Sequence, residues 1–278
     1  MLSSNRQDER EPIAFVRFEG SDLYYEEKGE GVPILLIHAG GATASTWGRA
    51  VDDLAQVGRV VTYDRRGHGR SGGDPVVSIP AHTADAAALL AALPAAPAVV
   101  VGVSVSATIA IDLALRRPDL VHAVVAHESP WRVRRQPPTL PQLAAFTRMG
   151  WLVGRGRHPE AVAAFLRFAY SYRDGGTAWD AFPEEWRRVA AENAHAALAD
   201  FRIAVGGYPS SEELATITRP VVCTYGERSN KPLVRVARSL ARVIPGATLT
   251  EIECAGHAAA FDAPANFVRV IAEAARSS

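Results

Sequence analysis

The chain has 278 residues, of which 48% are hydrophobic and 22% charged, so it carries enough apolar side chains for a large core. Thirty basic side chains balance thirty acidic ones, and a formal net charge of zero excludes a global field that would attract nucleic acid or an anionic membrane. No stretch approaches the roughly 18 uninterrupted apolar residues of a membrane span, and the first residues hold no signal-peptide core. We therefore expect a cytoplasmic globular protein with neither nucleic acid nor a membrane as partner.

The predicted elements begin after a polar N-terminal segment, residues 1–12, which we expect to be flexible. Two strands are predicted within residues 13–20 and 21–29, joined by a Gly-Ser turn that is typical of a hairpin. Short aliphatic runs then alternate with helical segments, at residues 33–38, 59–64, 98–102, 122–127, 220–225 and 247–253. Aliphatic runs without polar alternation indicate strands buried on both faces, and intervening helices indicate βαβ units. This order predicts an α/β fold, with a mostly parallel eight-stranded sheet flanked by helices.

One long interval, between the fourth and fifth aliphatic runs, has no strand pattern and contains three helical stretches. An interval of this kind, placed after the sixth predicted strand, is typical of a helical unit inserted into a larger domain. The chain is therefore expected to divide into a core domain, residues 13–130 and 217–278, and an inserted helical cap, residues 131–216.

Three glycines after the second aliphatic run, Gly67, Gly69 and Gly72, match the dinucleotide-binding pattern G-x-G-x-x-G. That pattern needs a helix to open at its third glycine. Pro75 and Pro80 argue against such a helix, and no group of His, Cys or carboxylate residues has metal-ligand spacing. We therefore expect neither a bound cofactor nor a metal ion.

A serine stands on a sharp turn after the third aliphatic run. In residues 98–118 a buried strand leads through Gly102, Ser104 and Ser106 into a helix that ends near Pro118. A serine held at such a turn projects its hydroxyl above the sheet, where the helix N-terminus favours negative charge. The segment resembles the nucleophile elbow, G-x-S-x-G, of the α/β-hydrolase family, with Ser106 in place of the second glycine. The resemblance implies Ser104 as nucleophile; the competing interpretation is a serine in an ordinary loop.

A second resemblance lies at residues 33–47, PILLIHAGGATASTW, which is similar to the family's H-G-x oxyanion loop with Ala39 in place of the first glycine. It implies that the backbone N–H groups of Gly40 and Val105 bind the negative oxygen of the reaction intermediate. The competing interpretation is a plain tight turn. The predicted substrate-binding residues are Gly41, Ser106 and Trp131.

The expected base, His257, follows the last aliphatic run, where the family carries its catalytic histidine. An imidazole there removes the proton of the serine hydroxyl. The usual position of the family's acid, after the seventh strand, holds Ser229, which carries no charge. A second arrangement in the family, seen in haloalkane dehalogenase relatives, places the acid at the end of the sixth strand and implies Glu128. Glu227 is the alternative acid, and a dyad without a carboxylate is the remaining possibility.

The serine nucleophile also indicates the reaction. Epoxide hydrolases and haloalkane dehalogenases of this fold attack with aspartate, whereas serine implies acyl transfer. We expect a serine hydrolase, monomeric or homodimeric, that acts on a small-molecule carboxylic ester, lactone or thioester through an acyl-enzyme on Ser104. The alternatives are a carbon–carbon bond hydrolase, lyase, perhydrolase or biosynthetic cyclase of the same fold, and a non-catalytic ligand-binding protein of the same fold.

Overall fold

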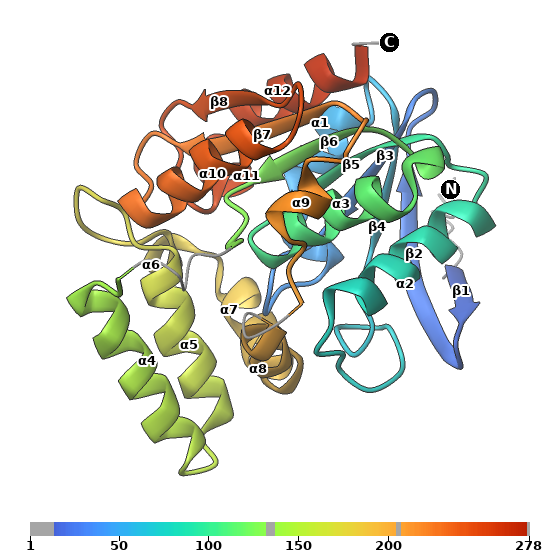
Figure 1. Cartoon of the computed structure of the whole chain (residues 1–278). Coiled ribbons are helices and arrows are strands. Elements are labelled where there is room, and N and C mark those ends of the chain that lie inside the picture. Colours follow the sequence, from blue (N-terminus) through green and yellow to red (C-terminus); the bar gives the residue numbers. More distant parts are fainter. Residues whose placement is uncertain (1–13, 132–136, 204–206, 277–278) are drawn as a thin grey trace, which may run out of the picture.

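A computed structural model describes residues 14–131, 137–203 and 207–276, and the predicted flexible segment, residues 1–12, lies outside these ranges. The strands are β1 (Ala14–Phe18), β2 (Ser21–Lys28), β3 (Pro33–Ile37), β4 (Arg59–Tyr63), β5 (Ala98–Val103), β6 (Val121–His127), β7 (Val221–Gly226) and β8 (Thr248–Ile252). They form one eight-stranded sheet in the order β1-β2-β4-β3-β5-β6-β7-β8 (Figure 1). β2 is antiparallel to β1 and β4, and all the other neighbouring strands are parallel. The predicted mostly parallel α/β sheet is confirmed.

Helices cover both faces of this sheet because the central strands are buried on both faces. Successive side chains of a strand point to opposite faces, so Val100 of β5 packs in one apolar cluster and Val101 in another. The first cluster includes α2 (Ile79–Ala92), α3 (Val105–Arg116) and α10 (Lys231–Val243). The second includes α1 (Arg49–Leu54) and α12 (Pro264–Arg276). Among the described residues, none of the helices is long and apolar enough to cross a membrane.

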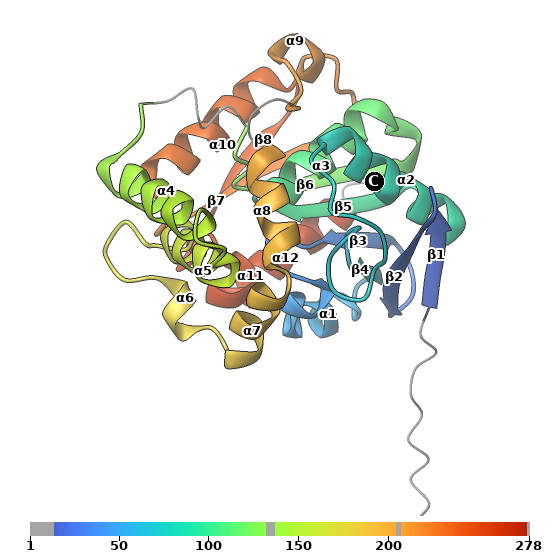
Figure 2. The ribbon, with the colours of Figure 1, turned by 90° about the horizontal axis from the view of Figure 1, so that it is seen from below.

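A group of helices between β6 and β7 lies to one side of the sheet (Figure 1). This helical insertion consists of α4 (Leu140–Val153), α5 (His158–Ala169), α6 (Ala178–Ala181), α7 (Glu184–Glu192) and α8 (Ala194–Ile203). It is followed by α9 (Ser211–Leu214), whose Leu214 packs in the core of the sheet domain. The insertion has an apolar cluster of its own, and α11 (Ala259–Asp262) lies close to the insertion on the sheet domain's side of this cluster (Figure 2). The rings of Phe182 and Phe261, which belong to this contact, are 4.9 Å apart.

Candidate active site

Four of the predicted site residues follow the carboxyl ends of strands. Gly40 comes after β3, Ser104 directly after β5, Glu128 directly after β6 and His257 after β8. In open α/β sheets the crevice outside these strand ends is the usual place for a ligand. The fold therefore brings residues from distant parts of the chain to one edge of the sheet.

Ser104 occupies a strained turn between β5 and α3. Its backbone has φ 61° and ψ −127°, a region that costs a non-glycine residue about 1–3 kcal/mol. The absence of a side chain at Gly102 lets the strand lie close to the first turn of α3, because a Cβ atom there would lie 2.2 Å from the carbonyl oxygen of Ser106. The N–H of Ser104 donates to the carbonyl oxygen of His127 at 2.9 Å, which ties the turn to β6. The side chain of Ser104 is only partly buried, at the N-terminus of α3.

Ser106, a predicted substrate-binding residue, lies beneath the turn and lines neither of the two cavities beside Ser104. Its side chain is fully buried, and Oγ accepts the N–H of Val103 at 2.8 Å. The same Oγ lies 2.7 Å from the carbonyl oxygen of Ile37 and 2.8 Å from that of Val103. Both oxygens are acceptors for its single hydroxyl proton. The hydroxyl therefore ties α3 to β3 and β5 beneath the turn, in the space where the family motif has a glycine.

Glu128 and His257 form a buried hydrogen-bonded pair. Oε2 of Glu128 lies 2.7 Å from Nδ1 of His257, and Oε1 accepts the N–H of Gly226 at 3.0 Å. Burial opposes the charge on Glu128, but the hydrogen bond from His257 and the attraction of that ring outweigh it and lower the pKa of Glu128 to about 2. Because an ionised carboxylate only accepts hydrogen bonds, Nδ1 of His257 carries a proton, and in the neutral form of the ring the lone pair is therefore on Nε2.

The alternative acid, Glu227, has a different partner. Its carboxylate accepts the backbone N–H of Cys254 at 2.9 Å, and its side chain is partly exposed. Ser229, at the family's usual acid position, is buried beside Glu128. The carboxylate at Nδ1 of His257 thus comes from the end of β6 and not from the loop after β7.

A second buried histidine, His127, holds the loop that carries His257. Its Nε2 lies 3.1 Å from the carbonyl oxygen of Gly256, and its Nδ1 lies 3.0 Å from Oγ1 of Thr224. Burial lowers the pKa of His127, so the ring is neutral and has one donor and one acceptor nitrogen. From the other side, Asp262 accepts the N–H of Gly256 at 2.8 Å. His127 was not predicted, and the only signal for it was a histidine at the end of an aliphatic run.

The predicted oxyanion loop lies beside the serine. Gly40, Ser104, Val105 and His257 line one cavity. Val105 is the first residue of α3, and the first N–H groups of a helix have no acceptor within the helix. Gly41 has φ 71°, a conformation that favours glycine, and it lines a neighbouring cavity. The backbone donors of Gly40 and Val105 are therefore placed at the same cavity as the serine hydroxyl.

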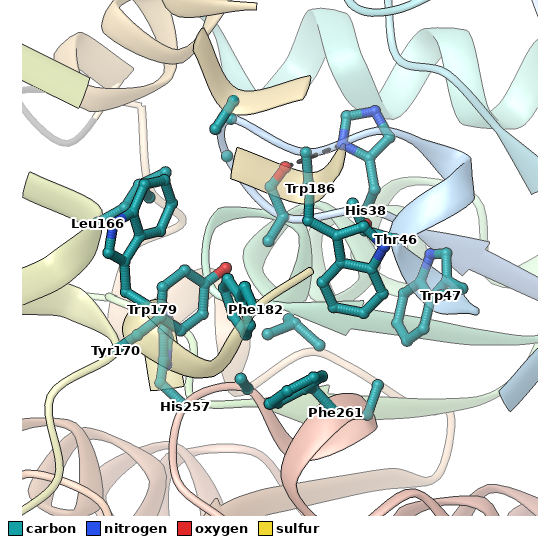
Figure 3. A pocket seen from close by; sticks show the side chains of 18 of the residues that line it. His38, Thr46, Trp47, Leu166, Tyr170, Trp179, Phe182, Trp186, His257 and Phe261 are labelled. Atoms are coloured by element: carbon teal, nitrogen blue, oxygen red, sulfur yellow. Dashed lines mark hydrogen bonds between the residues drawn. The ribbon is translucent and has the colours of Figure 1, made fainter. Parts of the chain in front are cut away.

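Two cavities meet at Gly40, Tyr170 and His257. The serine cavity is lined by Ser104 and by residues of the insertion, and it encloses about 690 Å³, partly open to solvent. The aromatic cavity encloses about 610 Å³, and its ring side chains surround the open space (Figure 3). The six large aromatic residues that line it are Trp47, Tyr170, Trp179, Phe182, Trp186 and Phe261.

Trp131 was predicted to contact the substrate, but the structure places it in the core of the sheet domain. It is 4% exposed, its Nε1 donates to the carbonyl oxygen of Pro209 at 2.7 Å, and it lines neither cavity. The neighbouring Pro130 does line the serine cavity. Trp131 is therefore next to a cavity-lining residue in the sequence, but its indole ring points away from the site.

An α/β sheet with a serine on a strained turn and a histidine–carboxylate pair at its strand ends defines a protein of the hydrolase type. Residues 34–270 match the model of the alpha/beta hydrolase family, and the chain belongs to this family.

Curated relatives match a smaller part of the chain. The uncharacterized hydrolase YraK of Bacillus subtilis is 40% identical over 112 residues, which are 39% of this chain and 41% of the relative. An epoxide hydrolase of Caballeronia sordidicola is 38% identical over 119 residues, 41% of this chain and 36% of the relative. The chain thus matches about two fifths of the length of these relatives.

Solved structures match nearly the whole chain. Est816, an N-acyl homoserine lactone degrading enzyme, has a TM-score of 0.74 at 26% identity, with 93% of this chain and 98% of the other covered. The enol-lactonase from Burkholderia xenovorans LB400 has a TM-score of 0.77 at 21% identity, with 94% and 99% covered. At this identity the second likeness shows the fold alone.

Proposed function

We propose that the chain is a serine hydrolase that cleaves a carboxylic ester, lactone or thioester through an acyl-enzyme on Ser104. The observation that carries the proposal is the 2.7 Å contact between Nδ1 of His257 and the buried carboxylate of Glu128, next to a cavity that Ser104 and His257 line together. A serine hydroxyl is a weak nucleophile until an oriented base removes its proton, and this pair supplies such a base.

The reaction follows from these positions. Nε2 of His257 takes the proton of Ser104 as Oγ attacks the carbonyl carbon, and Glu128 stabilises the resulting imidazolium. The N–H groups of Gly40 and Val105 bind the negative oxygen of the tetrahedral intermediate. His257 then gives the proton to the leaving oxygen or sulfur, which departs and leaves the acyl-enzyme. Water, activated by the same histidine, hydrolyses the acyl-enzyme and regenerates Ser104.

The walls of the site favour an uncharged, apolar substrate. The described residues that line the aromatic cavity include no Asp, Glu, Lys or Arg side chain. Burying a charged group there without a partner would be costly, whereas an aromatic or branched aliphatic group would be stabilised. Leu166 and Tyr170 of the helical insertion line both cavities, which supports a role for the insertion as a cap over the substrate. Est816, the structural neighbour named as an N-acyl homoserine lactone degrading enzyme, supports a lactone as one candidate substrate.

The epoxide hydrolase relative does not extend its reaction to this chain. Epoxide hydrolases of this fold attack with an aspartate, and the corresponding turn here carries Ser104. The chemistry supported by a serine is acyl transfer and not the formation of an alkyl ester.

The test is turnover of p-nitrophenyl esters of graded acyl length, with aliphatic lactones and thioesters in parallel, by wild type and Ser104→Ala. We expect wild type to be active and the variant to lose at least about 10³-fold in kcat. Binding of these compounds without any turnover by folded wild type would refute the proposal and favour a non-catalytic ligand-binding protein. Products of carbon–carbon cleavage or of peracid formation in place of hydrolysis would assign the serine to one of the alternative reactions.

A further inference from the structure

A buried cluster of polar side chains lies directly behind the oxyanion loop. At its centre, the guanidinium of Arg65 donates to both carboxylate oxygens of Asp200, from Nη1 at 2.9 Å and from Nη2 at 2.7 Å. Nε2 of His68 lies 3.2 Å from the same carboxylate, and Nε2 of His82 lies 3.3 Å from Nη1 of Arg65. Burial opposes the charge on Asp200, but Arg65 and His68 outweigh it and hold the pKa of Asp200 well below its ordinary value. The folded protein therefore keeps a fully buried ion pair.

The two partners come from different parts of the fold. Arg65 follows β4, whereas Asp200 lies on α8 of the helical insertion. A second contact joins the same regions, because the side chain of Asn193, just before α8, accepts the N–H of Gly69 at 2.7 Å. Desolvation offsets most of the attraction within a buried ion pair, and apolar residues of similar volume stabilise a fold equally well. Stability alone therefore does not explain why charges are kept at this position.

The cluster has a further contact that points to another role. Nη2 of Arg65 donates to the carbonyl oxygen of Ala39 at 3.3 Å, and Nδ1 of His38 lies 2.8 Å from the same oxygen. Nε2 of His38 accepts the backbone N–H of Arg65 at 2.9 Å. Burial, together with the charge of Arg65, lowers the pKa of His38 well below its ordinary value, so its single proton sits on Nδ1. The backbone N–H of Ala42 also donates to this oxygen, at 3.3 Å, so three donors hold the Ala39 carbonyl oxygen, and two of them are side chains.

That carbonyl belongs to the same peptide group as the N–H of Gly40. In a planar trans peptide the C=O and N–H bonds point in opposite directions, so an oxygen held toward Arg65 directs the N–H away from the cluster. Hydrogen bonds to the oxygen also polarise the peptide and strengthen its N–H as a donor. The carboxylate of Asp200 packs against Gly40 itself: a Cβ atom on this glycine would lie 3.2 Å from Oδ2.

We propose that Arg65 and Asp200 are positioning residues of the oxyanion hole, and that the helical insertion supplies Asp200 through α8. They act through the peptide group between Ala39 and Gly40, which they hold with its N–H toward the reacting carbonyl. The insertion then completes the catalytic machinery as well as covering the substrate. This inference rests on the proposed function, in which the N–H of Gly40 binds the oxyanion.

The test compares Asp200→Asn with Asp85→Asn. Asp85 is the matched control, because it is also buried and accepts two hydrogen bonds from an arginine, Arg66, which directly follows Arg65 in the chain. Deleting an oxyanion donor costs about 10²- to 10³-fold in kcat, so misplacing one by Asp200→Asn should cost about 10- to 100-fold, with KM within about 2-fold of wild type. Inhibition by an aryl trifluoromethyl ketone, whose serine adduct carries an oxyanion, should weaken by a similar factor. The Asp85→Asn variant should keep kcat within about 2-fold.

A second variant, Arg65→Lys, keeps a positive charge opposite Asp200 but loses the planar fork that reaches both Asp200 and Ala39. We expect its kcat to fall by about 10-fold, and it decides the question if Asp200→Asn does not fold. If both variants match Asp85→Asn in kcat, or lose activity only through KM, the pair serves the fold alone and the inference is overturned. Failure of the proposed function would be seen in wild type itself, as absence of both turnover and inhibition, whereas this inference fails only in variants of an active enzyme.

Discussion

Replacing Glu128 with Gln tests how the buried carboxylate prepares His257 for catalysis. In the wild type, one carboxylate oxygen accepts the N–H of Gly226 at 3.0 Å and the other accepts the Nδ1 proton of His257 at 2.7 Å. A Gln side chain has one oxygen and one NH₂ group, and the N–H of Gly226 requires the oxygen. The NH₂ group then faces Nδ1, which must accept, so the ring proton moves to Nε2. In this tautomer the imidazole cannot take the proton of Ser104.

The size of the effect follows from the same contacts. The ionised carboxylate of Glu128 lies 2.7 Å from Nδ1 of His257, so it stabilises the positive charge that forms on the ring in the transition state. A neutral Gln amide loses this charged hydrogen bond, and a loss of about 1.5–3 kcal/mol would slow the reaction about 10- to 150-fold. The wrong tautomer adds to this loss, so we expect kcat of Glu128→Gln to fall by about 10³- to 10⁴-fold.

Steady-state hydrolysis of p-nitrophenyl butyrate at neutral pH measures this loss, with circular dichroism as the check on folding. Glu227→Gln is the matched control and should keep kcat within about 3-fold, because its partner is the N–H of Cys254 and not His257. The reasoning is refuted if Glu227→Gln abolishes turnover while Glu128→Gln retains it.

Three further predictions concern stability and substrate choice. The pKa of Glu128 is lower in the folded than in the unfolded chain, so its contribution to stability is complete above about pH 4.5 and is lost as the pH falls toward 2. Between pH 6 and pH 3, the free energy of unfolding measured in urea should therefore fall more in wild type than in Glu128→Gln, and equal decreases would contradict this. Ser106→Ala leaves the N–H of Val103 without its acceptor, so the free energy of unfolding should fall by about 1–3 kcal/mol while kcat stays within a few-fold; unchanged stability in thermal unfolding would count against it. Phe182→Leu removes a ring from the aromatic cavity and should raise KM for esters of aromatic acids by about 3- to 10-fold, with little change for the acetyl ester. Equal changes in KM for both esters would show that the cavity does not bind the aromatic acyl group.

The fold was predictable because its signals are local. Every residue of β5 is buried, as its unbroken aliphatic run indicates, and the turn at Ser104 needs only the nearby Gly102. The pairing of Glu128 with His257, which lie 129 residues apart, was within reach because both follow strand ends that meet at one edge of the sheet. The order of the strands in the sheet therefore predicts this contact, although the two residues are far apart in the sequence.

Side-chain direction was not predictable in the same way. Ser106 and Trp131 both lie within two or three residues of the site in the chain, yet one hydroxyl is held by backbone groups and one indole points into the core. The ion pair of Arg65 and Asp200 joins residues 135 apart, and the packing of α8 against the loop at Gly40 brings them together. No local pattern marks such a contact, because it depends on how the insertion folds back over the sheet domain.

Covalent labelling of Ser104 tests the central claim most directly. Folded wild type is incubated with a fluorophosphonate, and the modified residue is located by peptide mapping in a mass spectrometer. We predict one adduct, on Oγ of Ser104, that is absent from Ser104→Ala and forms much more slowly in Glu128→Gln. A folded wild type that takes up no label, or takes it up at another serine, would contradict a nucleophile at this turn.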